Sequence, residues 1–181
     1  MPQPEKLPES VTTLLKSTRF IHLATSYEDI PHVSLMNYTY YHKNESDYII
    51  ISTPKGTTKY DNMVHNPNVS ILIHDWISAK TNSEANDSPA SNRRNSLYEL
   101  LANFNKNEIG RVSVTISGRA EILTHDTEKD DYLFYKSLHL NNSKIDQVQA
   151  KNYIEDDDNA LILVQIHGCK VTDTDNNVVE Y

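Results

Sequence analysis

Hydroxyl and lysine side chains gather in one short stretch of the chain, and their types suit a phosphate group. The stretch contains Ser52, Thr53, Thr57, Thr58 and Lys59. Hydroxyls can donate hydrogen bonds to phosphate oxygens, and a lysine ammonium supplies the opposite charge. A helix that starts at the threonines would point its free backbone N–H groups at the same place. An ordinary capped helix with solvated lysines is the alternative, and these residues alone do not separate the two.

The neighbouring residues predict the elements that position this stretch. Ile49 to Ile51 is a β-branched run typical of a buried strand, which Pro54 and Gly56 end. A short helix follows, with an apolar stripe at i, i+3 and i+4 formed by Tyr60, Met63 and Val64.

The ends of this helix also have sequence signals. Thr57 or Thr58 can cap its start, with Asp61 in the place of a capping-box acid. Asn66-Pro67 ends the helix, and alternating apolar residues over 69–73 begin the next strand.

The order of these residues resembles a known family. Gly56-Thr57-Thr58-Lys59, followed by Asn66-Pro67-Asn68-Val69, is similar to the FMN-phosphate segment of the pyridoxamine 5′-phosphate oxidase family, the FMN-binding split barrels. Ser117-Gly118-Arg119-Ala120-Glu121 resembles a second strand of that family. The resemblance covers roughly residues 19–76 and 111–171. It implies FMN-binding roles for Ser34, Leu35, Met36, Asn37, Ser52, Thr53, Thr57, Thr58 and Lys59.

Several of the family's stronger FMN ligands are replaced here. Ser34 and Thr58 stand where the family has arginine, Thr39 stands for a lysine, and Ser113 stands for an FMN-contacting glutamine. Arginine pairs with phosphate through two parallel hydrogen bonds, so its loss predicts weaker FMN affinity. A non-catalytic relative that keeps the dimeric barrel and has lost or weakened FMN binding is therefore the alternative interpretation.

Composition bounds the class of protein. The 181 residues suffice for one domain, predicted over 1–181, and the net charge of −8 disfavours nucleic acid and anionic membranes as partners. A single cysteine, Cys169, and the lack of a long apolar run favour a cytoplasmic location, with nuclear presence also compatible. The eight histidines are dispersed without a ligand-like pair, so we expect no metal site.

The rest of the chain alternates between short strands and helices. Strands are predicted over 19–25, 32–41, 112–122 and 160–171, and helices over 8–16, 97–104 and 126–140. The last helix has two neighbouring rows, one with Leu133 and the other with Tyr132, Tyr135 and His139. We expect a mobile loop at 80–95, inside an insertion over 77–110 whose role the sequence leaves open, and a frayed tail at 172–181.

These patterns and the resemblance together predict a mainly β, antiparallel split β-barrel with peripheral helices. The resemblance implies a homodimer with FMN in the groove between subunits, and an oxidoreductase that acts on a small molecule. The final ten residues lack Arg, Lys and Trp, which hold flavin and substrate phosphate in the oxidases. We therefore expect no efficient oxidation of pyridoxamine 5′-phosphate.

Overall fold

The computed structural model describes residues 6–75, 111–124, 129–142 and 158–181. The elements, in chain order, are α1 (Glu9–Ser17), β1 (Phe20–Tyr27), β2 (Ile30–Asn37), β3 (Thr39–Lys43), β4 (Ser46–Pro54), α2 (Thr58–His65), β5 (Asn68–His74), β6 (Val112–Leu123), α4 (Lys129–Asn142), β7 (Asn159–Asp173) and β8 (Val178–Glu180). The loop expected at 80–95 and the helix expected at 97–104 lie outside the described residues.

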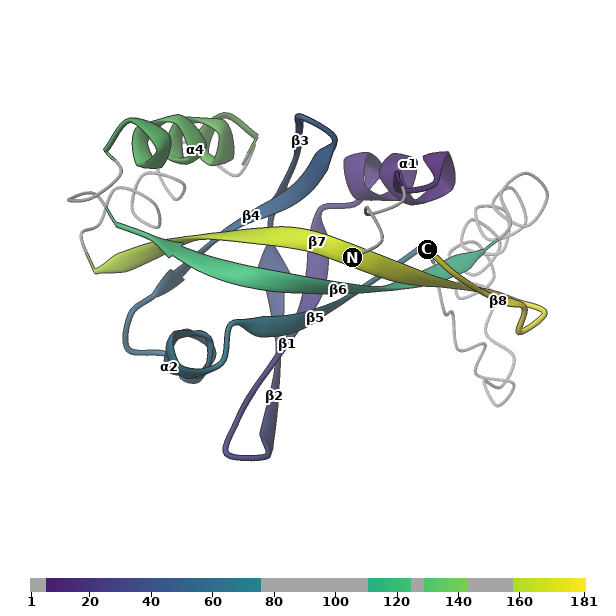
Figure 1. The fold of residues 1–181 in the computed structure, drawn as a ribbon, viewed down its shortest axis with the longest axis horizontal. Helices are drawn as coiled ribbons and strands as arrows, with labels where there is room; N and C mark the ends of the chain where they lie inside the picture. The colour runs from purple at the N-terminus through teal and green to yellow at the C-terminus, as the bar shows by residue number, and fades with distance from the viewer. Residues whose placement is uncertain (1–5, 76–110, 125–128, 143–157) are drawn as a thin grey trace, which may run out of the picture.

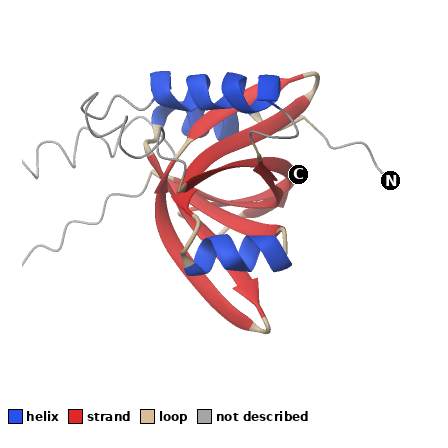
Figure 2. Cartoon of the chain, turned by 90° about the vertical axis from the view of Figure 1, so that its left-hand side faces the viewer, coloured by secondary structure: helices blue, strands red, loops and turns tan. Residues whose placement is uncertain are grey.

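The eight strands form one antiparallel sheet in the order β2-β1-β5-β6-β7-β4-β3, with β8 paired to β7 (Figure 1). The sheet is strongly curved, and β2 at one end comes back into contact with β4 near the other (Figure 2). Because successive side chains on a strand point to opposite faces, each strand gives its apolar side to the enclosed core. The core contains Ile21, Leu23, Ile49, Ile51, Ile71, Val114, Ile116 and Val164, all fully buried.

Helices cover the sheet from two sides. α1 and α4 lie on one side of the sheet and α2 on the opposite side in both views (Figures 1 and 2). α1 buries Val11, Leu14 and Leu15, and α2 buries Met63 in the same core. α4 covers a second, smaller apolar cluster that includes Ile50, Leu161 and Leu163.

Gly118 is required by the close approach of β6 to β7. A Cβ placed there would lie 2.7 Å from Val164 Cγ1 and 2.9 Å from the Gln165 carbonyl oxygen. The pairing register of β6 and β7 shifts between Ser117 and Gly118, which marks a bulge.

The strand expected over 32–41 is interrupted at Tyr38. β2 ends at Asn37 and pairs with β1, whereas β3 starts at Thr39 and pairs with β4. The Tyr38 hydroxyl donates to the Leu15 carbonyl oxygen (2.7 Å) and lies 2.8 Å from the Thr18 hydroxyl. These bonds hold the ring against α1 at the point where the chain changes partners.

The tail expected to fray over 172–181 is instead ordered by backbone pairing, and that prediction was wrong. β7 extends to Asp173, and β8 pairs with it from Lys170 to Thr172. The Cys169 and Tyr181 backbones exchange hydrogen bonds of 2.9 and 2.8 Å. The Asp173 carboxylate closes the turn by accepting bonds from the Asp175 and Asn177 backbones.

Candidate functional site

The end of β4 and the start of α2 form the region in which the sequence placed a phosphate. Thr53 is fully buried at the end of β4, and its hydroxyl oxygen lies 3.2 Å from that of Thr57. The Thr57 hydroxyl donates to the Pro54 carbonyl oxygen (2.9 Å). These bonds bring Thr53 and Thr57 together. They also engage both hydroxyl protons within the turn.

The N-terminus of α2 is left without a side-chain cap. Thr57 occupies the N-cap position, but its side chain makes no capping hydrogen bond, which corrects the expectation of a threonine cap. The Asp61 N–H bonds to the Thr57 carbonyl oxygen (3.0 Å) and closes the first helical turn. The N–H groups before Asp61 have no intrahelical acceptor, as in any α-helix. An anion placed here would therefore meet several backbone donors and the positive end of the helix dipole.

Lys59 adds a cation to this helix end. It lies in the first turn of α2 and is half-buried, and burial lowers the pKa of its ammonium group. Lys59 makes no ion pair within the described part of the chain. Gly56 has no atom within 4 Å of the position a Cβ would take, so the space above the turn is open. An ammonium that has lost part of its hydration and has no counter-charge favours an incoming anion.

The four predicted residues of β2 do not share one face. Met36 is buried in the core, and Ser34 and Asn37 are half-buried. Leu35 is 61% exposed and points to the outer face. β2 and α2 are in contact, so the inner residues of this strand lie beside the α2 region. Similarly, Ser52 is half-buried, one residue before the fully buried Thr53 on β4.

Two asparagines, the buried Asn62 and the half-buried Asn66, hold α2 in place, and sequence reasoning did not identify their role. The Asn62 amide donates to the Thr25 hydroxyl (3.1 Å), and both side chains are buried. The Asn66 amide donates to the Ser26 carbonyl oxygen (3.1 Å). The sequence signal for this role was a polar residue, Asn62, on the buried face of a short helix, because a buried polar group needs a hydrogen-bond partner. These bonds fix the middle and the C-terminal end of α2 relative to β1.

The described residues contain no group of three or more His, Cys, Asp or Glu side chains that could hold a metal ion. Cys169 is buried, and burial raises the pKa of its thiol, so it is not an activated nucleophile. Of the helices that the structure describes, none has the length and apolar character needed to cross a membrane.

Comparison with known proteins identifies the relatives of this chain. A family model described as pyridoxamine 5′-phosphate oxidase matches residues 7–171. A pyridoxamine 5′-phosphate oxidase homolog of Schizosaccharomyces pombe is 34% identical over 181 residues, which cover 97% of this chain and 90% of the relative. A pyridoxamine 5′-phosphate oxidase homolog from Saccharomyces cerevisiae is 33% identical over 193 residues, which cover 96% of this chain and 94% of the relative. The resemblance drawn from the sequence is confirmed.

Solved structures with the same fold include proteins with different ligands. A heme-binding protein from Mycobacterium smegmatis has a TM-score of 0.62 at 18% identity over 100% of this chain, which spans 58% of that chain. HutZ, a heme storage protein from Vibrio cholerae, has a TM-score of 0.58 at 14% identity, and the match covers 91% of this chain and 93% of HutZ. A FAD-binding protein from Mesorhizobium loti has a TM-score of 0.51 at 17% identity, and the match covers 91% of this chain and 94% of that protein. These likenesses confirm the split-barrel fold.

Proposed function

Because the chain belongs to the pyridoxamine 5′-phosphate oxidase family, we propose that it binds FMN and acts as an oxidoreductase on a small molecule. The observation that supports this most is the uncapped N-terminus of α2 beside the desolvated Lys59 ammonium. A bound flavin would supply the redox chemistry, and the protein would supply placement and electrostatics.

The residues present fit the phosphate end of FMN. Backbone N–H groups of the first turn of α2 and the Lys59 ammonium would donate to phosphate oxygens. Thr58 is exposed at the same turn and would add a hydroxyl. The hydroxyls of Thr53 and Thr57 would have to rotate away from their present acceptors before they could donate.

We propose that the inner part of β2 and the end of β4 line the rest of the cofactor. Ser34 is half-buried and polar, which suits the ribityl hydroxyls, and Met36, buried on the same face, would back the ring edge from the core. Asn37 shares the face of Leu35 at the end of the strand, where its half-buried amide would reach the cofactor from the interface side. Ser52 completes this set at the end of β4. Leu35 faces away from this side of the strand, so its contribution would be to the subunit interface.

An exposed apolar face supports the homodimer. Leu35 of β2, His22 of β1 and Leu72 of β5 lie in one row across three strands. Val33 is 65% exposed, and the same face also exposes Leu35 and Leu72. A contiguous apolar surface of this kind marks an interface. We propose that a second copy of the chain covers it and that FMN lies in the groove between the copies.

A titration of the purified protein with FMN tests the cofactor proposal. Flavin fluorescence should be quenched on binding, and Lys59→Ala should weaken affinity by about 1.5–3 kcal/mol, the range for a hydrogen bond to a charged group. Lys43→Ala is the matched control, because Lys43 is exposed at the end of β3. Absence of quenching at micromolar protein, or equal affinities of the two variants, would contradict the proposal. A parallel titration with hemin tests whether the chain instead resembles its heme-binding structural neighbours in ligand.

The dimer has its own test. Sedimentation equilibrium should give the mass of two chains, and Leu35→Glu should give a monomer that has also lost FMN. A wild-type monomer at micromolar concentration would exclude the intersubunit flavin groove.

A non-catalytic relative remains the second candidate, favoured by a specific observation at β2. Ser34, which replaces the family's arginine, lies 3.4 Å from His32 Nδ1. Because Ser34 and Thr58 stand where the family has arginine, a substrate or cofactor phosphate loses a bidentate partner. We expect FMN-loaded protein to show little turnover of pyridoxamine 5′-phosphate, measured by oxygen consumption. Turnover equal to that of an authentic oxidase would show that these replacements are unimportant.

A further inference from the structure

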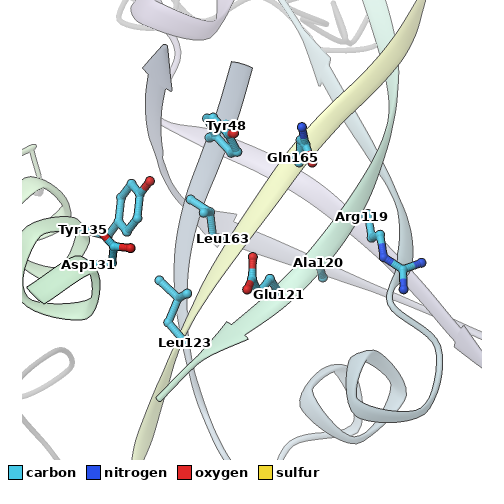
Figure 3. A pocket seen from close by; sticks show the side chains of 9 residues that line it. All are labelled: Tyr48, Arg119, Ala120, Glu121, Leu123, Asp131, Tyr135, Leu163 and Gln165. Carbon is cyan, nitrogen blue, oxygen red and sulfur yellow. The ribbon is translucent and has the colours of Figure 1, made fainter. Parts of the chain in front are cut away.

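A cavity of about 640 Å³ lies under α4, on the outer face of β4, β7 and β6 (Figure 3). Its polar lining consists of Tyr48, Arg119, Glu121, Asp131, Tyr135 and Gln165. None of its lining residues belongs to the FMN-binding set proposed above. The volume lies within the range of small-molecule sites, which is about 300–1,000 Å³.

The polar side chains of this cavity are unpaired within the part of the chain that the structure describes. None of the six makes a hydrogen bond or an ion pair within the residues that the structure describes. Arg119 of β6 lies opposite Gln165 of β7 in the strand pairing, and Glu121 lies two residues further along β6. Neither the Arg119 guanidinium nor the Glu121 carboxylate forms an ion pair within the described residues. Arg119, Glu121, Asp131 and Gln165 are exposed to solvent, so these unpaired side chains are accessible to a ligand.

Tyr135 is the lining residue that most clearly indicates a binding site. Tyr135 is only 7% exposed, and its hydroxyl has no hydrogen-bond partner among the described residues. The hydroxyl points to the side on which Tyr48 lies, and the Asp131 carboxylate lies near the opposite end of the ring (Figure 3). The hydroxyl is not among the fully enclosed unpaired atoms of the described residues, so it reaches the open space of the cavity. Buried tyrosine hydroxyls usually find a partner.

The electrostatics at this end of the cavity favour a positive charge. Burial raises the pKa of the Tyr135 hydroxyl, and the nearby carboxylates of Asp131 and Glu121 raise it further. The hydroxyl therefore stays protonated and neutral, while two carboxylates act on the same space. The Arg119 guanidinium lies at the far end, beyond Ala120 (Figure 3). Leu123 and Leu163 supply an apolar wall between the two ends.

We propose that this cavity binds a small organic cation, namely an ammonium group carried on a flat apolar body. The ammonium would donate to the Glu121 and Asp131 carboxylates, and the tyrosine rings would add cation–π attraction. The apolar body would lie on Leu123 and Leu163, and the Tyr135 hydroxyl would gain its missing partner. An anion would meet like charge at this end. The inference does not depend on flavin binding, because the two sites share no residue.

Calorimetric titration of the full chain with tyramine tests this inference. Tyramine carries an ammonium on a phenol ring, 4-ethylphenol lacks the charge, and 3-(4-hydroxyphenyl)propionate reverses it. Tyramine should bind at least about tenfold more tightly than either analogue, as expected for one charge-assisted hydrogen bond. Saturating FMN should leave the tyramine affinity unchanged. Equal affinity for the three compounds, or no tyramine binding at millimolar concentration, would overturn the proposal.

Variants separate a binding role from a structural one. Glu121→Gln should weaken tyramine binding about tenfold, and Tyr135→Phe should weaken it by a smaller factor. Glu9→Gln is the matched control for charge, because Glu9 is exposed on α1. Circular dichroism and the thermal midpoint establish that each variant is folded. Folded Glu121→Gln protein with wild-type tyramine affinity would show that the cation does not bind at these carboxylates.

Discussion

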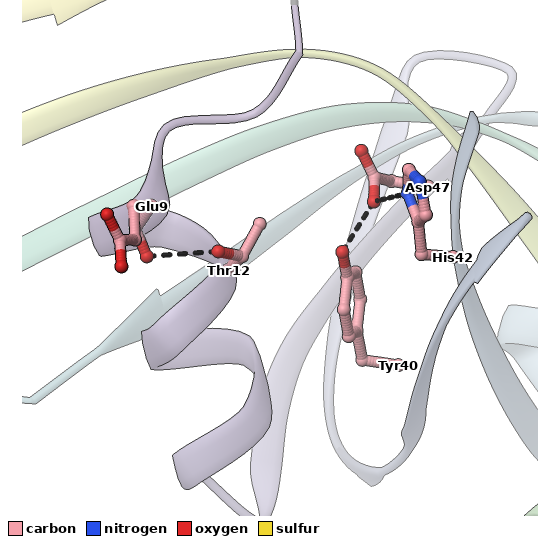
Figure 4. A network of polar contacts seen from close by, with 5 residues as sticks. All are labelled: Glu9, Thr12, Tyr40, His42 and Asp47. Carbon is pink, nitrogen blue, oxygen red and sulfur yellow. Dashed lines mark hydrogen bonds and ion pairs between the residues drawn. The ribbon is translucent and has the colours of Figure 1, made fainter. Parts of the chain in front are cut away.

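Two groups of polar side chains adjoin β4, and they differ in whether their members are paired. In the first, Asp47 Oδ1 accepts a 2.5 Å hydrogen bond from the Tyr40 hydroxyl and lies 2.8 Å from His42 Nδ1 (Figure 4). In the second, the cavity under α4, Glu121 and Tyr135 have no such partners among the described residues. The first group satisfies itself and stabilises the β3–β4 hairpin. In the second, the exposed Glu121 and the buried Tyr135 lie on the same cavity and are not held by another described side chain, so both are available to a ligand.

The same contrast occurs along a single helix. His139 of α4 is 3% exposed, and its Nδ1 lies 2.9 Å from the Thr39 hydroxyl. The Asn142 amide donates to that hydroxyl as well (3.2 Å). Tyr135 lies one turn earlier and faces the cavity. Polar residues on one helix thus serve stability at one position and remain available to a ligand at the next.

The largest effect that we expect from this contrast is a pH dependence through His139. Burial lowers the pKa of His139 from 6.5 to about 4. The unfolded chain takes up a proton near pH 6.5 while the folded chain does not, so acid favours unfolding. The free energy of unfolding should fall by about 3 kcal/mol through this group as the pH falls from 7 to 4.

Urea unfolding of the wild type and of His139→Gln at several pH values isolates this contribution. The variant removes the titrating group while keeping a hydrogen-bonding side chain. Its stability should therefore depend less on pH between 7 and 4. Identical pH profiles would show that the imidazole is accessible to protons in the folded state.

The next effect concerns Asp47, the shared acceptor of the paired group. Asp47→Asn should lower the free energy of unfolding by about 1.5 kcal/mol, because a charge-assisted interaction with His42 and Tyr40 is lost. Glu121→Gln is the matched change of acid to amide in the unpaired group and should cost less than about 0.5 kcal/mol. Equal losses in urea unfolding would contradict the distinction between the two groups.

The sequence was sufficient for the elements whose apolar periodicity is regular. The isoleucines of β4, the stripe of Tyr60, Met63 and Val64 on α2, and the alternation of β6 each predicted an element that the structure contains. In β4 and β6 the residue pattern itself records which residues are buried, so no tertiary information is needed. On α2 the pattern predicted the helix but not its whole buried face, because Val64 is 51% exposed and Asn62 is buried.

The rest depended on contacts between distant residues. The break at Tyr38 results from hydrogen bonds to residues 20 and 23 positions earlier. β8 contains only three residues and owes its order to pairing with β7, which local composition does not record. Within α4, the row with Tyr135 and His139 faces the sheet while Leu133 is 46% exposed, so hydrophobicity alone did not identify the buried face. The pairing of a polar group is likewise visible only once its neighbours are placed.

Tyrosine hydroxyls give a smaller effect and a closer comparison. Tyr38 and Tyr135 are both buried, but within the described residues the Tyr38 hydroxyl has hydrogen-bond partners and the Tyr135 hydroxyl has none. Tyr38→Phe should lower the free energy of unfolding by about 1 kcal/mol, and it would leave the Leu15 carbonyl oxygen without its donor. Urea unfolding of both proteins, with the same dependence of the free energy on urea concentration, measures this difference. A neutral result would mean that water replaces the lost hydroxyl.

Tyr135→Phe should have the smallest effect on the protein alone. The substitution removes a hydroxyl that makes no hydrogen bond to any residue the structure describes, and it keeps the ring contacts with Tyr41 and Phe134. The free energy of unfolding should therefore change by less than about 0.5 kcal/mol, because no intramolecular bond is broken. The same variant should lose part of the stabilisation that tyramine gives the wild type, because a ligand stabilises only the state that binds it. Thermal unfolding of both proteins with and without tyramine measures the two quantities together. A loss of 1 kcal/mol or more without ligand, similar to that expected for Tyr38→Phe, would show that the hydroxyl is satisfied by the folded protein and that the two tyrosines do not differ.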